Sequence, residues 1–430
     1  MRERQWASQN PLSPSVFAAD VDWVACMTPA IASYRDPIHG FIHADELEQA
    51  LINCRPLQRL RSIHQLGFTY LVYPGAEHSR FSHVLGAMEL AGKVYDTLAA
   101  KQPSILEDDR RSRERRLVRA AALLHDIGHA PFSHSAEDLF EQHIDHEAMT
   151  TRLLRLEEIE HIFDRHGNGL HAAEVGELLD SPGTPQKRLL SQIISGELDV
   201  DKMDYLLRDS LYCGVRYGSF DLARLLETIE PLLDPDTGEW GIGVEEGGVH
   251  ALEALVMARY YMFTQVYFNL TGKALELHFN EWLKEMGQLW PADAATFLEH
   301  DDISAMVRMR DSKSPHAAAI VRRRYYPVAF ETNEHLSTED KRRFERLLPD
   351  LERHFGTDNL LVSNSAKDPH RLGASRVLVR QRDNALVPME EASQFIRHLG
   401  RIERYRIYTP PELKDVVADE VGRRWADVQI

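Results

Sequence analysis

Apolar residues recur at helical spacing through most of the chain between residues 34 and 283. A helix is predicted over residues 81–100, because its apolar side chains return every three or four positions. The same period predicts helices over residues 114–127, 198–211 and 249–283, the first of them ended by Gly128 and Pro131. Between the last two, "DPDTGEWGIGV" has the turn residues and alternation of a hairpin. The pattern predicts a mainly α fold with a helical core over residues 33–290.

Strand-like alternation enters the pattern in the last third of the chain. "SRVLVRQ" and "RYRIYT" predict strands, and each is followed by a segment of helical period, "PMEEASQFIRHLG" and "PPELKDVVADEVGRRW". A small C-terminal α+β lobe is therefore predicted over residues 291–430. Residues 1–32 are polar and interrupted by proline, which is typical of a loosely docked arm.

The composition is that of a globular protein with a large core, because 43% of the 430 residues are hydrophobic and 27% are charged. Cys26, Cys54 and Cys213 are scattered and form no CxxC pair, which predicts buried thiols in a reducing compartment. No segment reaches the roughly 18 to 20 apolar residues that span a bilayer, and the first residues lack a signal-peptide core. We therefore expect a cytoplasmic protein with no membrane partner.

The formal net charge of −17 disfavours nucleic acid and anionic membranes as partners, because like charges repel at long range. A small anionic substrate stays compatible with this charge where cations gather locally. The 21 histidines are distributed unevenly, and many of them fall between residues 39 and 171.

The segment "LLHDIGHAPFSHS" places several titratable side chains directly after an apolar helix. The adjacent His125 and Asp126 offer an imidazole nitrogen and a carboxylate oxygen to one metal ion. His129 lies one turn further if the helix continues, and His134 follows shortly after. A buried structural network is the alternative for these residues. The second His-Asp pair of the chain, at residues 300 and 301, stands in a polar stretch and is expected to be ordinary surface.

Two other segments carry polar residues at helical spacing. In "EHSRFSHVLGAMEL", Arg80 and His83 share one face at a helix start, where they offer a cation and a further ligand. In "GELDVDKMDYLLRDS", polar side chains repeat every four residues along one face: Asp201, Tyr205 and Asp209. Lys202 is adjacent. A polar stripe of this kind is usually the solvated face of a helix, which is the alternative here.

The ordered motifs "HSRFSH", "HDIGHAPFSH" and "DVDKMDYLLRD" resemble those of the HD-domain deoxynucleoside triphosphate (dNTP) triphosphohydrolases. This family includes the human sterile-alpha-motif and HD-domain dNTPase and bacterial dGTPase-like proteins. "DPIHGFI" and "LQRLRSIHQLG" extend the resemblance, which covers roughly residues 34–283. The amino-terminal arm is too short for a sterile-alpha-motif domain.

The resemblance implies one divalent metal ion held by four side chains: His83, His125, Asp126 and Asp201. A set of two imidazoles and two carboxylates suits iron, manganese, zinc or magnesium, so the identity of the ion stays open. The resemblance also implies a group around the reacting phosphate: His129, His134, Glu137 and His146. Glu137 stands where human-type members carry aspartate, one methylene shorter.

The activity implied by the resemblance is hydrolysis of a dNTP to a nucleoside and inorganic triphosphate. A divalent ion would lower the pKa of the attacking water, while protonated His134 would donate to the departing 5′-oxygen. Three cations are candidates for the phosphate chain: Arg80, Lys202 and Arg259. Further sugar or phosphate contacts are implied for five residues: Gln65, Leu66, Tyr205, Asp209 and Tyr267. For Leu66 and Tyr267, simple core packing is the alternative.

Two positions depart from the family pattern. After Tyr267 the sequence reads "FNLTGK", where many relatives carry a histidine and an earlier basic residue, and Lys273 is the nearest substitute. Asn53 stands where guanine-activated members carry aspartate, and an amide cannot accept the same paired hydrogen bonds from guanine. We therefore predict activity without GTP, or a response to another nucleotide effector.

The resemblance further implies a homo-oligomer such as a tetramer. Two other functional classes stay open. One is an HD phosphohydrolase acting on another nucleotide or phosphoester, although the GYP signature of the cyclic-dinucleotide branch is absent. The other is a non-catalytic nucleotide sensor with the same fold.

Overall fold

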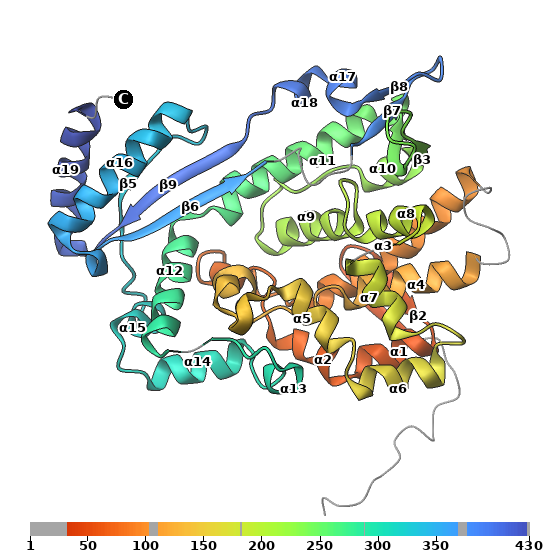
Figure 1. The fold of residues 1–430 in the computed structure, drawn as a ribbon, viewed down its shortest axis with the longest axis horizontal. Coiled ribbons are helices and arrows are strands. Elements are labelled where there is room, and N and C mark those ends of the chain that lie inside the picture. The colour runs from red at the N-terminus through yellow and green to blue at the C-terminus, as the bar shows by residue number, and fades with distance from the viewer. Residues whose placement is uncertain (1–31, 103–110, 181–182, 288, 369–375, 428–430) are drawn as a thin grey trace, which may run out of the picture.

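The computed structural model describes residues 32–102, 111–180, 183–287, 289–368 and 376–427 (Figure 1). The predicted arm of residues 1–32 lies outside these ranges, except for Ala32. The described chain begins with an antiparallel hairpin, β1 (Ala32–Asp36) and β2 (Gly40–Ala44), followed by the short helices α1 (Glu46–Asn53) and α2 (Arg55–Arg59).

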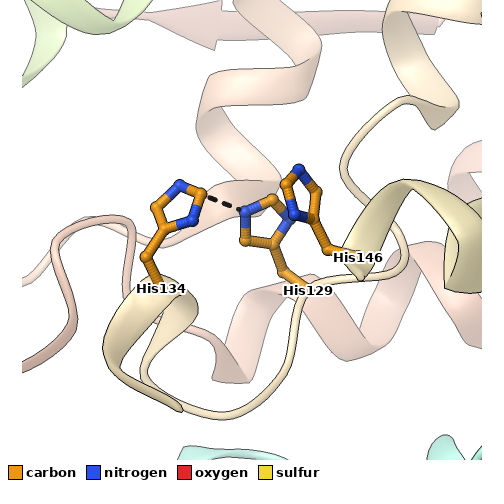
Figure 2. Close-up of side chains that lie close together, drawn as sticks. All are labelled: His129, His134 and His146. Carbon is orange, nitrogen blue, oxygen red and sulfur yellow. Dashed lines mark hydrogen bonds between the residues drawn. The ribbon is translucent and has the colours of Figure 1, made fainter. Parts of the chain in front are cut away.

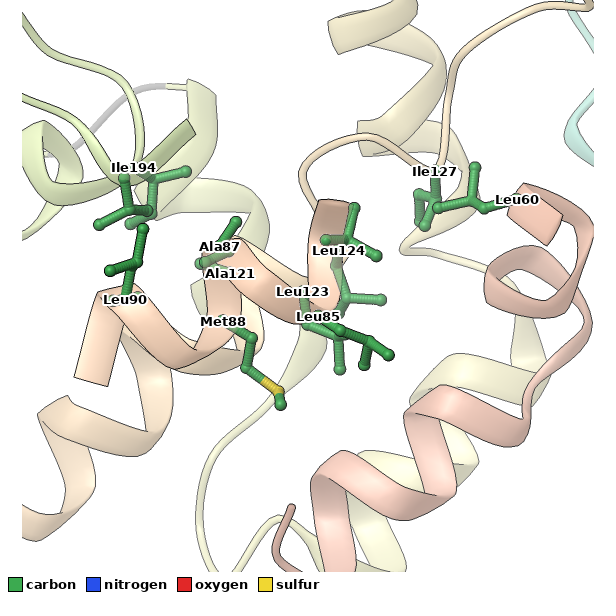
Figure 3. Close-up of a cluster of buried hydrophobic side chains, with 14 of the residues drawn as sticks. Leu60, Leu85, Ala87, Met88, Leu90, Ala121, Leu123, Leu124, Ile127 and Ile194 are labelled. Atoms are coloured by element: carbon green, nitrogen blue, oxygen red, sulfur yellow. The ribbon is translucent and has the colours of Figure 1, made fainter. Parts of the chain in front are cut away.

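Three helices form the centre of the molecule: α3 (Arg80–Lys101), α4 (Arg111–Leu124) and α9 (Val200–Tyr212). Figure 3 shows apolar side chains of α3, including Leu85 and Met88, beside Leu123 and Leu124 of α4. Small residues let these helices approach closely. A Cβ atom on Gly86 of α3 would lie 1.9 Å from a carboxylate oxygen of Asp204 on α9, so this contact requires glycine.

Four further helices surround this centre: α5 (His146–Leu153), α6 (Glu157–His166), α7 (Ala172–Asp180) and α8 (Pro185–Ile194). The predicted helices over residues 81–100 and 198–211 are confirmed. The helix predicted over residues 114–127 is wrong at its end, because α4 stops at Leu124 and residues 125–128 form a turn. His129 is therefore not placed by a continuing helix.

The single helix predicted over residues 249–283 is also wrong. The structure has α11 (Val249–Met262), a π-helical turn (Phe263–Tyr267) and α12 (Leu270–Glu285). The break has a local cause, because the Asn269 side chain caps α12 by accepting hydrogen bonds from the backbone of Thr271 and Gly272, at 2.9 and 3.2 Å.

The strands of the C-terminal part belong to two small sheets, one of which also contains the hairpin of residues 229–245. One has the order β3 (Ile229–Leu233), β4 (Trp240–Glu245), β7 (Leu378–Arg380) and β8 (Leu386–Pro388), and its first pair is the predicted hairpin. The other has the order β5 (Val328–Glu331), β9 (Ile402–Tyr408) and β6 (Leu361–Lys367). The helix α16 (Thr338–Phe355) packs with α19 (Lys414–Asp427), which contacts β5. The helix predicted over residues 388–400 is broken at Ser393 into α17 (Met389–Ala392) and α18 (Gln394–His398).

The mainly α fold with a small α+β lobe is confirmed, but the packing has no break between residues 290 and 291. Three helices continue the main core: α13 (Ala294–Phe297), α14 (Asp302–Asp311) and α15 (Pro315–Val321). Val379 and Ile396 belong to the same core. A separate apolar cluster forms between α16, β9 and α19, around Phe344 and Ile407, and a small third cluster joins Ala274 to Leu361 and Tyr408.

Cys54 and Cys213 are buried and form no disulfide, whereas Cys26 lies outside the described residues. Among the helices that the structure describes, none combines the length and the apolar character needed to cross a bilayer.

Candidate active site

A cavity of about 940 Å³ lies where α5, α9, α11 and the loop after α4 meet. Every residue predicted to bind metal, to transfer protons or to bind substrate lines this cavity except His83, which is fully buried behind its wall. The three separated motifs therefore converge on one site. The pair at residues 300 and 301 is absent from the lining and is half-buried rather than surface, with Asp301 capping α14.

A cluster of two imidazoles and two carboxylates forms the wall between α3 and α9. One ligand atom from each of His83, His125 and Asp126 lies within 4.8 Å of the others. The Oδ1 atom of Asp201 lies 3.0 Å from Nε2 of His83 and 3.6 Å from Nε2 of His125. The four predicted ligands therefore share one small volume.

The hydrogen bonds of the two imidazoles suit a divalent ion. Nδ1 of His125 donates to the Ala122 carbonyl at 2.8 Å, and Nδ1 of His83 donates to Asp204 at 2.8 Å. Both Nε2 atoms are buried and make no hydrogen bond in the described structure. When Nδ1 carries the proton, the Nε2 lone pair is free to bind a metal. The donor set of this cluster could hold a divalent ion.

The carboxylates of this cluster stay ionised. Burial raises the pKa of Asp126, but the charges of Arg80 and His125 outweigh it, so this pKa lies below the usual range. Burial likewise raises the pKa of Asp201, and its close contacts with the imidazoles of His125 and His83 bring this pKa well below the usual range. Arg80 also donates from Nε to Ser133 at 2.8 Å, which connects the cluster to the loop after α4.

Asp204 is a residue of this site that the sequence analysis missed. It is completely buried and accepts hydrogen bonds from His83, from His39 at 2.6 Å and from Arg208 at 2.8 Å. Arg208 in turn donates to Asp36 at 2.8 Å. The available signal was spacing, because Asp204 follows Asp201 by three positions and so lies on nearly the same helix face. We infer that Asp204 orients His83.

Replacing Asp204 with asparagine is expected to weaken metal binding by about 10 to 100-fold, the usual cost of losing a partner behind a metal-binding imidazole. Metal affinity should be measured by titration of the metal-free protein. Asp36→Asn is the matched control, because it also removes a carboxylate from Arg208 but does not touch His83. Both variants should lower the unfolding free energy, by roughly 3 kcal/mol or less. Equal metal affinity in Asp204→Asn and wild type would contradict the role of Asp204.

A second group of imidazoles lies beside this cluster. Figure 2 shows His129 between His134 and His146, with Nε2 of His129 and Nε2 of His134 3.5 Å apart. Nδ1 of His134 bonds to Glu137 at 2.8 Å, and Nδ1 of His146 bonds to the other oxygen of the same carboxylate. Glu137 therefore holds two imidazoles, despite being longer by one methylene than the aspartate of human-type members.

Gly128 explains how His146 comes to lie against His129. A Cβ atom on Gly128 would lie 2.1 Å from the backbone oxygen of His146, so only glycine lets α5 approach the turn this closely. The following loop is held in left-handed backbone geometry at Phe132 and Ser133, with φ of 58° and 60°. Asp302 of α14 accepts from the Phe132 amide at 2.6 Å and fixes this loop.

The two imidazoles beside His134 have opposite electrostatic surroundings. Burial and the charge of Arg80 bring the pKa of His129 well below its usual value, so His129 is a neutral imidazole. Burial also lowers the pKa of His146, but the hydrogen bond and charge of Glu137 raise it above its usual value. Burial raises the pKa of Glu137, but its hydrogen bonds with His134 and His146 lower this pKa by more, so it lies below the usual range. The group can therefore store and transfer a proton.

The other end of the cavity is built around Asp209. Its carboxylate accepts from the Tyr267 hydroxyl at 2.8 Å and bonds to Nε2 of His78 at 2.8 Å. His78 was missed by the sequence analysis, although it lies two positions before Arg80. The rings of Tyr205 and Tyr267 meet edge to face at 6.3 Å. Leu66 and Tyr267 are half-buried and line the cavity, so core packing alone does not account for them.

The predicted cations are engaged to different degrees. The Lys202 ammonium donates to the Asp199 carboxylate and to the Gly196 carbonyl, at 2.8 Å from the latter, and its contact with the phosphate chain stays a prediction. Lys273, the predicted substitute, is paired with Glu276 at 2.6 Å. Arg259 is buried and lines the cavity.

Asn53 is exposed at the end of α1, away from the cavity lining, and its role in effector response stays a prediction.

Comparisons with known proteins match nearly the whole described chain. The model of the HD domain matches residues 80–209, and that of the HD associated region matches residues 220–425. Uncharacterized protein YwfO of Bacillus subtilis is 40% identical over 60% of this chain and 56% of its own length. The deoxynucleoside triphosphate triphosphohydrolase SAMHD1 homolog of Dictyostelium discoideum is 29% identical over 87% of this chain and 76% of its own length.

Among solved structures, a phosphohydrolase from Bacteroides thetaiotaomicron VPI-5482 superposes with a TM-score of 0.70 at 25% identity. The match covers 88% of this chain and 100% of that one. The chain spans just over half of the length of several curated relatives that it matches.

Proposed function

The chain belongs to the HD-domain phosphohydrolase family related to the SAMHD1 dNTPases, and we propose that it hydrolyses dNTPs to a deoxynucleoside and inorganic triphosphate. The observation that carries the proposal is the arrangement of one cavity. A cluster suited to a divalent ion, a proton-transferring histidine group and a polar group with aromatic side chains all lie at this cavity. A phosphohydrolase needs a metal cluster and a proton-transferring group for any substrate. The polar group with aromatic side chains, in contrast, is suited to a nucleoside.

The cluster of His83, His125, Asp126 and Asp201 is proposed to hold the metal ion. A divalent ion at this position would lower the pKa of water and neutralise phosphate charge. Arg80 is positioned to bring the α-phosphate to the same place, because it lies between the cluster and the loop that carries His134.

His134 is proposed to protonate the departing 5′-oxygen. Its Nδ1 is hydrogen-bonded to Glu137, which leaves Nε2 as the atom that can carry and release a proton. Its side chain is 62% exposed, so this proton can be replenished from solvent or from a substrate group in the cavity. His129, as a neutral imidazole, lies close enough to accept a hydrogen bond from the same atom.

The sugar is proposed to lie against Leu66, Tyr205 and Tyr267, with its 3′-hydroxyl at Asp209. The carboxylate of Asp209 is already oriented by His78 and Tyr267, so it is fixed before the ligand arrives. Gln65 has a buried side-chain oxygen that makes no hydrogen bond in the described structure, and it is a candidate acceptor for the same sugar.

The product pattern tests the proposal directly. Metal-reconstituted protein should be incubated with each dNTP and NTP, and the products separated by anion exchange. Deoxynucleoside plus inorganic triphosphate is the expected result. Monophosphate plus pyrophosphate, or diphosphate plus phosphate, would contradict cleavage at the α-phosphate. Nucleotide binding without any product would favour a sensor.

Ribonucleotides are expected to react roughly 10 to 150-fold more slowly than the matching dNTPs. A 2′-hydroxyl pressed against Leu66 and the Tyr267 ring loses its water without gaining a partner, which costs about 1 to 3 kcal/mol. Leu66→Ala should narrow the dATP to ATP ratio of kcat/KM. Leu71→Ala is the control, because Leu71 ends the short helix that follows Leu66 but lies outside the cavity lining. Equal rates on dATP and ATP in the wild type would refute the sugar contact. The predicted homo-oligomer, nucleotide effector and cytoplasmic location stay predictions.

A further inference from the structure

The last residue of β6, Lys367, reaches the cavity from the C-terminal lobe. β6 pairs antiparallel with β9 along its whole length, from Leu361 opposite Tyr408 to Lys367 opposite Ile402. Figure 1 shows this strand crossing from the lobe toward α11. The backbone of Lys367 is therefore held by a paired strand, while its exposed side chain lines the cavity.

The Lys367 ammonium is placed among the groups of the proposed phosphate site. Its Nζ atom lies 5.5 Å from the centre of the Phe263 ring, and the Arg259 guanidinium lies 5.5 Å from the same ring. The two cations thus flank one aromatic side chain. Within the ranges that the structure describes, the Lys367 ammonium makes neither a hydrogen bond nor an ion pair, and its contact is with the Phe263 ring.

The charges around Lys367 place it in the field of the catalytic groups. Desolvation in the cavity and the charges of Arg259 and Lys202 lower its pKa, whereas Asp201 and Glu137 raise it. Lys367, Arg259 and Lys202 thus line one cavity together, as is typical of a site whose ligand is anionic.

Three other cations of the cavity already have carboxylate partners. Arg80 is paired with Asp126. Lys202 is paired with Asp199, and Lys273 with Glu276. A triphosphate chain carries several negative charges, so it needs positive charge beyond what these neutralised side chains offer. Lys367 differs from them, because no carboxylate has to be displaced before it binds a phosphate.

We propose that Lys367 binds the phosphate chain beyond the α-phosphate, so that the C-terminal lobe completes the active site of the HD core. This inference rests on the proposed triphosphohydrolase function, because the phosphate chain that Lys367 binds belongs to the substrate of that function. Lys367 acts as a substrate-binding residue and is not required for proton transfer at the leaving oxygen.

The test is the affinity of metal-loaded protein for inorganic triphosphate, measured by calorimetry with the full chain. Lys367→Gln should raise the Kd at least about tenfold, as expected for a lost charge-assisted hydrogen bond. Lys367→Arg should stay within about threefold of the wild type, because it keeps the charge. Lys414→Gln is the matched control, since it removes an exposed lysine of the same lobe that lies outside the cavity lining.

Steady-state kinetics give a second readout. Lys367→Gln should raise KM for dATP by a similar factor and lower kcat by less. An unchanged Kd and KM in Lys367→Gln would overturn the inference about Lys367, while product analysis of the wild type would still decide the proposed function. A wild type that binds no inorganic triphosphate would also overturn the inference about Lys367, whereas the proposed function is decided by the product pattern alone.

Discussion

Asp126→Ala should lose the bound metal ion and the hydrolytic activity together. Asp126 contributes a carboxylate to the cluster and neutralises Arg80, so its removal leaves two imidazoles beside an uncompensated cation. Losing a partner behind a ligand usually costs up to about 100-fold in metal affinity or activity, and loss of a ligand itself should exceed this. No rescue by a higher metal concentration is expected, because Arg80 would repel the ion.

Metal content after reconstitution should be measured by mass spectrometry alongside the rate on dATP. Asp201→Asn serves as a second ligand variant, because it removes a charge without freeing Arg80 and is less at risk of failing to fold. Asp236→Ala is the control, since it also breaks an arginine–aspartate pair but on the exposed surface, with Arg376. Full metal occupancy in both ligand variants would show that the cluster is not the metal site.

His134→Ala should bind metal and substrate nearly normally but turn over at least about 100-fold more slowly, the usual scale for a lost proton donor. Glu137→Gln should lower kcat in the same direction, because an amide cannot hold His134 and His146 as a carboxylate does. In a variant that carries both substitutions, the fold-loss of kcat should not exceed the product of the two single fold-losses, since both residues act on one proton transfer.

The chain supplies a matched control for this experiment. His250 and Glu253 repeat the spacing and the 2.8 Å contact of His134 and Glu137, but at the start of α11 and outside the cavity lining, with His250 93% exposed. His250→Ala should therefore leave kcat unchanged. If His134→Ala retained wild-type turnover, His134 would not be the acid. Loss of metal in this variant would instead assign His134 to the support of the metal cluster.

The sequence by itself determined the elements whose causes are local. The helices around residues 81–100 and 198–211 were predictable because apolar side chains keep a regular period there. The candidate ligands were also predictable, since His125 and Asp126 are adjacent and covalent geometry keeps them together. Arg80 and His83 share one face of α3 for the same reason, because three residues span nearly one helical turn.

Tertiary structure decided which polar groups neutralise one another. Lys202 was a candidate for phosphate binding because of its charge, but in the structure its ammonium donates to the carboxylate of Asp199 at the start of α9. Asp204 looked like one more polar position on a helix, yet its burial against Gly86 makes it the partner of His83. These assignments depend on burial and on distance in space, and neither is visible in spacing along the chain.

The end of α4, the break after α11 and the position of Lys367 were likewise decided by packing. A helical period continues through residues 249–283, but the π-helical turn and the Asn269 cap interrupt it. Lys367 lies 166 positions after Asp201 and reaches the same cavity only because β9 holds β6 in register. The periodicity of a segment depends on which side chains are buried over one or two turns. The contact of two segments that are distant in sequence depends instead on the packing of the whole core.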